Sequence, residues 1–182
     1  GRMKQLSVRH LTILGICVAL NYVGATIALF LRLPVYLDAF GTVLASFLLG
    51  PVYGACTGVC SALLNFAISD PYALYYAPVQ IILGLLAGVL YRSGWLRGGK
   101  FPAGIVFLTI PGTAVSSLIT AYLFGGITSS GSSLLVQLFH HAGLNLTASV
   151  FAVQILTDGL DRLIVVCCML ALARAIPAGL SR

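Results

Sequence analysis

The chain carries very little charge. Of its 182 residues, 8% are Asp, Glu, Lys or Arg, and only four are acidic. With 59% hydrophobic residues and a mean hydropathy of +1.05, a chain folded in water would expose large apolar patches, which argues against a soluble globular protein. The composition instead predicts an all-α integral membrane protein.

Enzyme motifs are also scarce. The chain has no GxSxG, no HExxH and no P-loop glycine-lysine pattern. Residues 158–162, DGLDR, match the start of the CDP-alcohol phosphotransferase motif but lack its later glycine and paired aspartates. We therefore expect no enzyme, no catalytic residue and no cofactor. Without a nucleotide site, uphill transport would need energy from a partner or from an ion gradient.

The five cysteines do not form a convincing metal site. Cys56 and Cys60 are four residues apart, which places them on one face of a helix, but no histidine or carboxylate lies near them in the sequence. All five lie in apolar stretches. We expect small buried apolar residues rather than metal ligands.

Six apolar stretches approach the length of a membrane-spanning helix, which needs about 17 to 25 residues. They cover residues 10–31, 36–50, 52–69, 76–92, 102–125 and 159–176. Residues 126–157 begin with a Gly/Ser-rich run and continue with helical periodicity, which predicts an outer lid or re-entrant segment. The whole chain, 1–182, is expected to form one membrane domain.

The basic residues predict the orientation of these spans. With the N-terminus inside, the inner loops and ends collect eight basic residues and the outer side keeps Arg32 and Arg162. This imbalance follows the positive-inside rule and predicts that both termini are cytoplasmic. The net charge of +6 is thereby explained without nucleic acid. The inner residues are Arg2, Lys4, Arg9, Arg92, Arg97, Lys100, Arg174 and Arg182.

Several spans carry Gly or Ala every four residues, a spacing that lets helix backbones approach closely in a membrane. Two explanations stay open: packing within this bundle, or docking of another membrane subunit. The residues are Gly15, Ala19, Gly24 and Ala28 in the first span, Gly54, Gly58 and Ala62 in the third, and Gly84 and Gly88 in the fourth.

Polar and aromatic residues gather at the predicted outer ends of the spans, as expected for a pocket that binds a small molecule. An interfacial belt of aromatic residues is the alternative for any single tyrosine. Asp158, Asp161 and Arg162 are expected at the start of the last span, where the helix dipole favours carboxylates. The candidate binding residues are Tyr36, Asn65, Tyr72, Tyr75, Tyr76, Gln80, His140 and Asn145.

Residues 37–65, with Asp38, the Gly41-Thr42 pair and the Gly50-Pro51 pair, resemble the substrate-binding S components of energy-coupling factor (ECF) vitamin transporters. Residues 158–177 are similar to the last helix of that family. The resemblance implies a six-helix bundle in the bacterial plasma membrane that captures a vitamin outside and topples to release it inside. It also implies a transmembrane T subunit and two ATPase subunits as partners, with Gly15 and Ala19 at the T-subunit contact.

The count of charged residues in the predicted outer half indicates which vitamins are favoured as ligands. Four aspartates and two arginines lie in the predicted outer half, and an anionic ligand would need a surplus of cations. Pantothenate, folate and biotin are therefore disfavoured. The resemblance is greatest to cobalamin-associated S components, with riboflavin as the next candidate. A stand-alone secondary transporter and an intramembrane enzyme remain as alternatives, although neither inverted repeats nor a nucleophile with its base is visible.

Overall fold

The computed structural model describes residues 8–32, 37–68, 71–124, 132–143 and 145–176, and all regular secondary structure in these ranges is helical. Short 3-10 helices at Ala73–Tyr76 and Gly98–Lys100 lead into α4 and α5. The α-helices are α1 (Val8–Phe30), α2 (Phe40–Leu49), α3 (Pro51–Ile68), α4 (Ala77–Arg92), α5 (Phe101–Phe124), α6 (Ser132–His141) and α7 (Leu146–Ala175).

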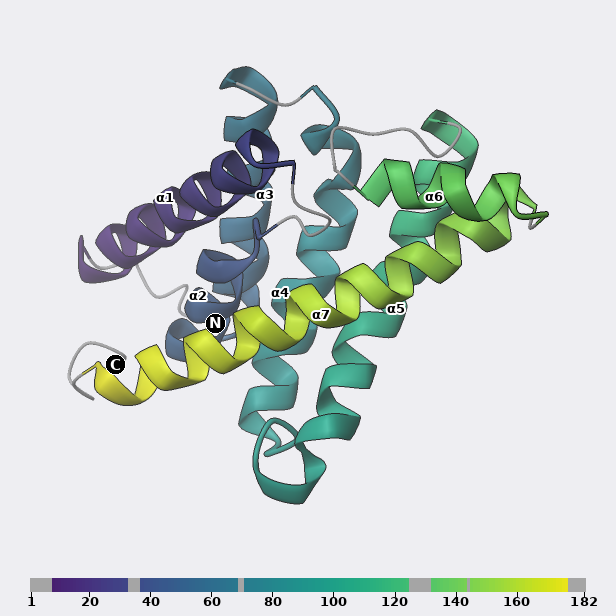
Figure 1. Cartoon of the computed structure of the whole chain (residues 1–182). Coiled ribbons are helices and arrows are strands. Elements are labelled where there is room, and N and C mark those ends of the chain that lie inside the picture. The colour runs from purple at the N-terminus through teal and green to yellow at the C-terminus, as the bar shows by residue number, and fades with distance from the viewer. Residues whose placement is uncertain (1–7, 33–36, 69–70, 125–131, 144, 177–182) are drawn as a thin grey trace.

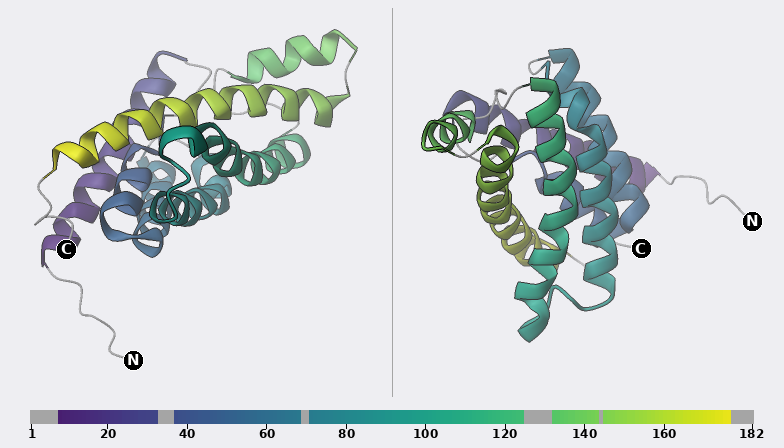
Figure 2. Two further views of the ribbon diagram at one scale, coloured as in Figure 1. Left: turned by 90° about the horizontal axis from the view of Figure 1, so that it is seen from below. Right: turned by 90° about the vertical axis from the view of Figure 1, so that its right-hand side faces the viewer.

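The short helix α2 lies in the middle of the bundle, where α1, α3, α4 and α7 all pack against it. Helices α3, α4 and α5 run side by side, and α1 and α7 cross them obliquely (Figure 1). Helix α6 lies along the first turns of α7 (Figure 2). The core around α2 is apolar and includes Val43, Leu83, Leu108 and Val165.

Glycine, proline and asparagine mark the ends of several helices. Gly50 adopts φ 114°, a left-handed conformation that suits glycine, and Pro51 follows as the first residue of α3. Asn145 caps α7 by accepting a hydrogen bond from the backbone N–H of Ala148 at 2.7 Å. These local signals explain why the chain turns sharply between α2 and α3 and why α7 begins where it does.

The glycines of α3 and α4 are used for packing inside the bundle. A Cβ atom placed on Gly84 would lie 2.5 Å from backbone atoms of Gly54 and Ala55. One placed on Gly88 would lie 2.6 Å from the ring of Pro51. Gly15 differs, because nothing lies within 4 Å of its added Cβ atom. The small residues of α3 and α4 therefore bring these two helices together, whereas Gly15 faces away from the bundle.

Four described segments are long and apolar enough to cross a membrane: Val8–Leu31, Pro51–Ile68, Ala73–Arg92 and Gly98–Leu123. Helix α2 is apolar but has ten residues, about 15 Å at the α-helical rise, roughly half the hydrocarbon thickness. Helix α7 starts at Leu146 rather than at 159, so its first turns occupy part of the predicted outer segment. The count of six spans and the cytoplasmic location of both termini remain predictions.

Candidate functional site

A network of buried polar groups joins α1, α2, α3 and α4. Its centre is Asn21, which is 0% exposed in the middle of α1. The Asn21 amide nitrogen donates to the hydroxyls of Thr42 (2.7 Å) and Ser61 (2.8 Å). Its carbonyl oxygen accepts from the backbone N–H groups of Gly41 (2.7 Å) and Thr42 (3.2 Å). An asparagine amide has two donors and two lone pairs, so Asn21 is saturated.

Asn21 thereby caps α2 from a neighbouring helix. The N–H groups of Gly41 and Thr42 belong to the first turn of α2, where no carbonyl of the same helix can accept them. The close approach requires glycine at position 41, because a Cβ atom there would overlap the backbone carbonyl of Cys17. The contact between α1 and α2 is therefore backbone to backbone at this level.

The network continues through Gln80 of α4 toward the loop before α2. The Thr42 hydroxyl donates to Gln80 Oε1 at 3.0 Å, and the Gln80 amide nitrogen donates to the backbone carbonyl of Asp38 at 3.3 Å. We call Asn21, Gly41, Thr42, Ser61 and Gln80 the Asn21 network.

Beside the Asn21 network lies a charged cluster, which we define as Asp38, Asp158, Asp161 and Arg162. Arg162 pairs with Asp161, and both residues are buried on α7 together with Asp158. The cluster holds three of the four acidic residues of the chain. The guanidinium of Arg162 interacts electrostatically with all three carboxyl groups. An excess of carboxyl groups in a buried site disfavours the binding of anions.

The charged cluster also fastens the loop before α2 to α7. Asp161 accepts a hydrogen bond from the backbone N–H of Leu37 at 3.0 Å, across 124 positions of sequence. Leu37 has φ 53°, a conformation that a leucine rarely adopts. The contact with Asp161 helps to hold the backbone in this conformation.

Asp38 lies in the loop between α1 and α2, outside the helices. Burial raises the pKa of its carboxyl group to about 6, and the negative charge of Asp161 acts in the same direction. The guanidinium of Arg162 opposes both effects by lowering the pKa. Asp38 therefore takes up a proton at mildly acidic pH, where an ordinary aspartate would remain ionised.

A second line of polar groups runs between α5 and α7. Thr113 donates its hydroxyl to the Asp158 carboxylate at 2.8 Å, and the Gln154 amide nitrogen donates to the Thr120 hydroxyl at 2.9 Å. Ser117 lies on α5 between these two contacts, one helical turn from each threonine. We call Thr113, Ser117, Thr120, Gln154 and Asp158 the α5–α7 seam.

The α5–α7 seam is not saturated. Ser117 Oγ and Gln154 Oε1 have no hydrogen-bond partner among the described residues, although the side chains are buried, with residue exposures of 3% and 2%. Leaving a buried polar group unpaired costs about 1–3 kcal/mol, and native structures contain few such groups. Two of them in one seam indicate a place where a ligand can supply the missing partners.

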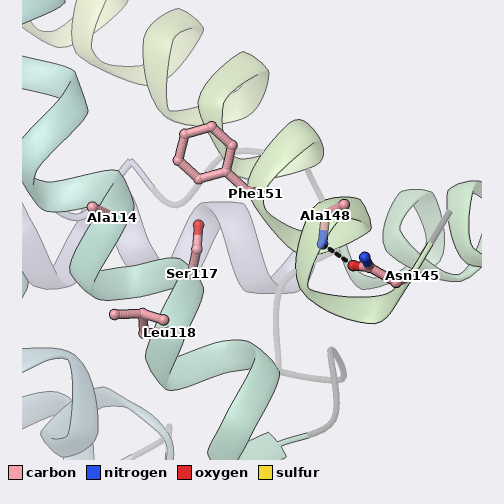
Figure 3. A pocket seen from close by; sticks show the side chains of 6 residues that line it. All are labelled: Ala114, Ser117, Leu118, Asn145, Ala148 and Phe151. Atoms are coloured by element: carbon pink, nitrogen blue, oxygen red, sulfur yellow. Dashed lines mark hydrogen bonds between the residues drawn. The ribbon is translucent and has the colours of Figure 1, made fainter.

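A groove of about 490 Å³ opens beside the seam, between α5 and the first turns of α7. Figure 3 shows the Ser117 hydroxyl directed toward the side of the groove where the Phe151 ring lies. Asn145 stands at one end, held by its hydrogen bond to Ala148. The lining residues are Ala114, Ser117, Leu118, Asn145, Ala148 and Phe151. The groove therefore combines an apolar wall with one unpaired hydroxyl.

Four of the predicted binding residues lie at these features. Gln80 belongs to the Asn21 network, and Asn65 is attached to it by donating to the backbone carbonyl of Ser61 at 3.0 Å. The Tyr76 hydroxyl lies 2.6 Å from the Thr120 hydroxyl of the seam. Asn145 lines the groove. The structure thus divides these residues between two polar regions.

Three of the other predicted binding residues are more peripheral. Tyr72 is half-buried just before the 3-10 helix Ala73–Tyr76, and Tyr75 is exposed within it. His140 is exposed in the last turn of α6. None of these three residues lines the groove. Tyr36 lies outside the described residues.

The expected location of Asp158, Asp161 and Arg162 is wrong. These residues lie near the middle of α7, where they are buried, and the N-cap is Asn145. They are too far from the N-terminal end of α7 to be stabilised by the helix dipole, because its effect falls off within the first turn. Arg162 forms its ion pair with the neighbouring Asp161.

The cysteine expectation also needs correction. Cys17 is buried, but Cys56, Cys60, Cys167 and Cys168 are exposed on the outer surfaces of their helices. An apolar thiol can face lipid as readily as a protein core, so position within a span did not predict burial. In the described part of the chain, no group of three His, Cys, Asp or Glu residues could hold a metal ion.

The hydroxyl residues of α5 are the functional candidates that sequence reasoning missed. Thr113, Ser117 and Thr120 recur at spacings of four and three, which places them on one face of the helix. A face of hydroxyl groups in an otherwise apolar helix was the available signal. Serine and threonine are ordinary in membrane helices, so this signal becomes informative only when the opposite side chains are known.

The chain was compared with known proteins. The family described as "ECF transporter, substrate-specific component" matches residues 9–173. No curated protein and no solved structure gives a significant match. The family match extends from the second residue of α1 almost to the end of α7 and so includes the Asn21 network, the charged cluster and the α5–α7 seam. The chain belongs to the family of substrate-specific components of ECF transporters.

Proposed function

We propose that this chain captures a vitamin on the outer side of the bacterial plasma membrane, using the α5–α7 seam and the adjoining groove. The observation that carries the proposal is the pair of buried, unpaired oxygens in the seam, beside an open groove with an apolar wall. Small-molecule sites combine mostly apolar linings with a few polar groups that fix orientation. The predicted residues Tyr76 and Asn145 lie at this site and support its assignment.

The charges favour a neutral vitamin. Arg162 is buried and paired with Asp161, and two further carboxyl groups surround it, so it is a poor anchor for an anion. Arg32 is exposed beyond the end of α1. Cobalamin is our first candidate and riboflavin the second, because both offer large ring systems to an apolar wall.

We also propose that a T subunit and two ATPases drive release of the vitamin inside, through toppling of the chain in the membrane. The docking surface would be the outward face of α1, where Gly15 and Ala19 are exposed together with Leu11, Ile16 and Val23. Because no neighbour lies within 4 Å of a Cβ atom on Gly15, packing inside the bundle does not explain glycine there. A flat surface of small residues suits close contact with another membrane helix.

Reconstitution tests both proposals. The chain alone, in liposomes, should bind cobalamin or riboflavin without accumulating it, and accumulation should require the T subunit, both ATPases and ATP. Gly15→Trp should leave binding unchanged and lower the recovery of the T subunit on co-purification by tenfold or more, or about 1.4 kcal/mol. Ile164→Trp, an exposed position on α7, is the matched control.

Other outcomes would favour other functions. ATP-independent accumulation by the chain alone would contradict the ECF mechanism and support a stand-alone secondary transporter. Chemical conversion of the added vitamin would support an intramembrane enzyme. If Gly15→Trp binds the T subunit as the parent chain does, the docking surface lies elsewhere.

A further inference from the structure

We propose that Ser117 and Gln154 select a ligand whose flat apolar ring carries a hydrogen-bond donor. The inference deepens the proposed function and rests on it. It concerns which chemical group the α5–α7 seam recognises. The two residues come from opposite helices, α5 and α7, and together they contribute both unpaired oxygens of the seam.

The direction of the hydrogen bonds in the seam determines which chemical groups the ligand must carry. Gln154 donates its amide nitrogen to Thr120, which leaves the carbonyl oxygen as the unpaired atom. A carbonyl oxygen can only accept, so its missing partner must be an N–H or O–H group. Ser117 offers a hydroxyl, which can accept or donate. The seam therefore demands at least one donor from the ligand and tolerates either kind of group at its second contact.

The Thr120 hydroxyl fixes the position of Gln154. It lies 2.9 Å from the Gln154 amide nitrogen and 2.6 Å from the Tyr76 hydroxyl, so three side chains from separate helical segments meet there. Gln154 also lies three positions after Phe151, and such residues are neighbours on a helix surface. Gln154 itself does not line the groove, but it lies about one helical turn from Phe151, which does.

The residues that line the groove indicate that the larger part of the ligand is apolar. Apart from Ser117 and Asn145, its lining residues are Ala114, Leu118, Ala148 and Phe151, which carry no polar side-chain atoms. Phe151 is 43% exposed, so part of its ring is available for contact with a second ring. A ligand without a flat apolar portion would leave this wall unused, and a ligand without a donor would leave Gln154 unpaired.

Binding affinity of the full chain for riboflavin and cobalamin, measured by calorimetry in detergent, tests the inference. Riboflavin carries an imide N–H on its flat ring, and cobalamin carries primary amides around its corrin ring, so both can donate. For whichever vitamin binds, Ser117→Ala and Gln154→Leu should each weaken affinity about tenfold, which corresponds to about 1.4 kcal/mol. If riboflavin binds, methylation of its imide nitrogen should produce a similar loss.

Two control variants separate recognition from general disturbance. Thr109→Val removes a buried hydroxyl from the same helix, but that hydroxyl donates to Ile105 of its own helix at 2.7 Å, so binding should be unchanged. Ser117→Thr keeps a hydroxyl at the groove, and its affinity should stay within about threefold of the parent chain.

The outcomes are distinguishable. Unchanged affinity in Ser117→Ala and Gln154→Leu, or equal losses in these variants and Thr109→Val, would overturn the inference while vitamin binding itself stands. Failure of the parent chain to bind either vitamin would overturn the proposed substrates, and with them the inference that depends on vitamin binding.

Discussion

The Asn21 network and the α5–α7 seam differ in how completely their buried polar groups are paired, although Asn65 Oδ1 on α3, outside both sets, is also unpaired among the described residues. In the α1–α4 half, Asn21 uses all four of its hydrogen-bonding positions within the protein. In the α5–α7 half, Ser117 and Gln154 each leave an oxygen unpaired at similar depth of burial. A saturated network stabilises one arrangement of its helices, whereas an unsaturated one gains partners when a ligand arrives.

The glycines show the same contrast. Gly41, Gly54, Gly58, Gly84 and Gly88 each lie against a neighbouring segment so closely that an added Cβ atom would clash. In α7, an added Cβ atom on Gly159 would meet nothing within 4 Å, and on Gly112 of α5 it would meet a single atom, at 3.6 Å. Two glycines depart from this contrast: a Cβ atom on Gly15, on the outward face of α1, would meet nothing within 4 Å, and one on Gly104, near the start of α5, would overlap the carbonyl oxygen of Trp95. We infer that α2, α3 and α4 form a fixed scaffold and that α5 and α7 are less tightly packed around Gly112 and Gly159.

The largest effect is expected from Asn21→Leu. The substitution leaves two backbone N–H groups at the start of α2 and the Ser61 hydroxyl without their partner, at a position that is fully buried. The free energy of unfolding, measured by titration with a denaturing detergent, should fall by about 3–5 kcal/mol. Asn145→Ala, which removes an exposed helix cap, should cost about 1 kcal/mol. Equal losses would mean that the Asn21 network has no special role in stability.

Gly84→Ala should have the next largest effect. The new methyl group would meet the backbone of α3 at 2.5 Å and force α3 and α4 apart, lowering stability by about 2 kcal/mol. Gly159→Ala is the matched change in the other half, and it should raise stability by about 0.5–1 kcal/mol because alanine favours a helix. Equal destabilisation of both variants would contradict the proposed difference in packing around Gly84 and Gly159.

Smaller stability changes are expected for the seam. Ser117→Ala removes a hydroxyl whose oxygen has no partner. Gln154→Leu loses the hydrogen bond to Thr120 but also removes an unpaired carbonyl oxygen, so the two changes oppose each other. Without ligand, Ser117→Ala should raise the free energy of unfolding by about 1 kcal/mol, because an unpaired buried hydroxyl is removed, and Gln154→Leu should stay within about 1 kcal/mol of the parent chain. A loss near that of Asn21→Leu would show that the seam is part of the scaffold.

A further prediction concerns pH. The pKa of Asp38 is raised to about 6 by burial, so the folded state binds this proton more tightly than the unfolded state does. The resulting stabilisation is complete below about pH 4 and is lost as pH rises to about 6. Asp38→Asn keeps the backbone carbonyl that Gln80 uses and should flatten the dependence of the unfolding temperature on pH in this range. An unchanged pH profile would contradict the buried position of the carboxyl group.

Much of the helical framework could be predicted because apolar runs and their Gly or Pro boundaries are local signals. The Gly50-Pro51 pair separates α2 from α3 where the sequence places a turn, and α4 ends at Arg92 as predicted. The start of α7 was missed. The Gly/Ser-rich run and Gly143 obscured Asn145, whose capping role depends on the backbone geometry of the residues after it.

The candidate site was only partly predictable. Tyr76 and Asn145, which lie at the seam and the groove, were among the predicted residues because polar groups between apolar spans are conspicuous, and their role in binding stays a prediction. Ser117 and Thr120 were not among them, since single hydroxyls in an apolar helix acquire meaning from Gln154 on another helix. Asp158 and Asp161 were noticed but placed at a helix end, because sequence position cannot show that α7 continues through them and buries them.

The hydrogen bond from Leu37 to Asp161 has a consequence for biosynthesis. The loop before α2 emerges from the ribosome early, but the carboxylate that holds it belongs to the last helix, 124 residues later. At translation rates of about 5–20 residues per second, the loop waits roughly 6 to 25 seconds for this partner. During that time the first four helices can pack around Asn21, and the left-handed backbone at Leu37 gains its support last. The charged cluster therefore cannot close before α7 is synthesised, whereas the Asn21 network contains only residues of α1 to α4 and can form earlier.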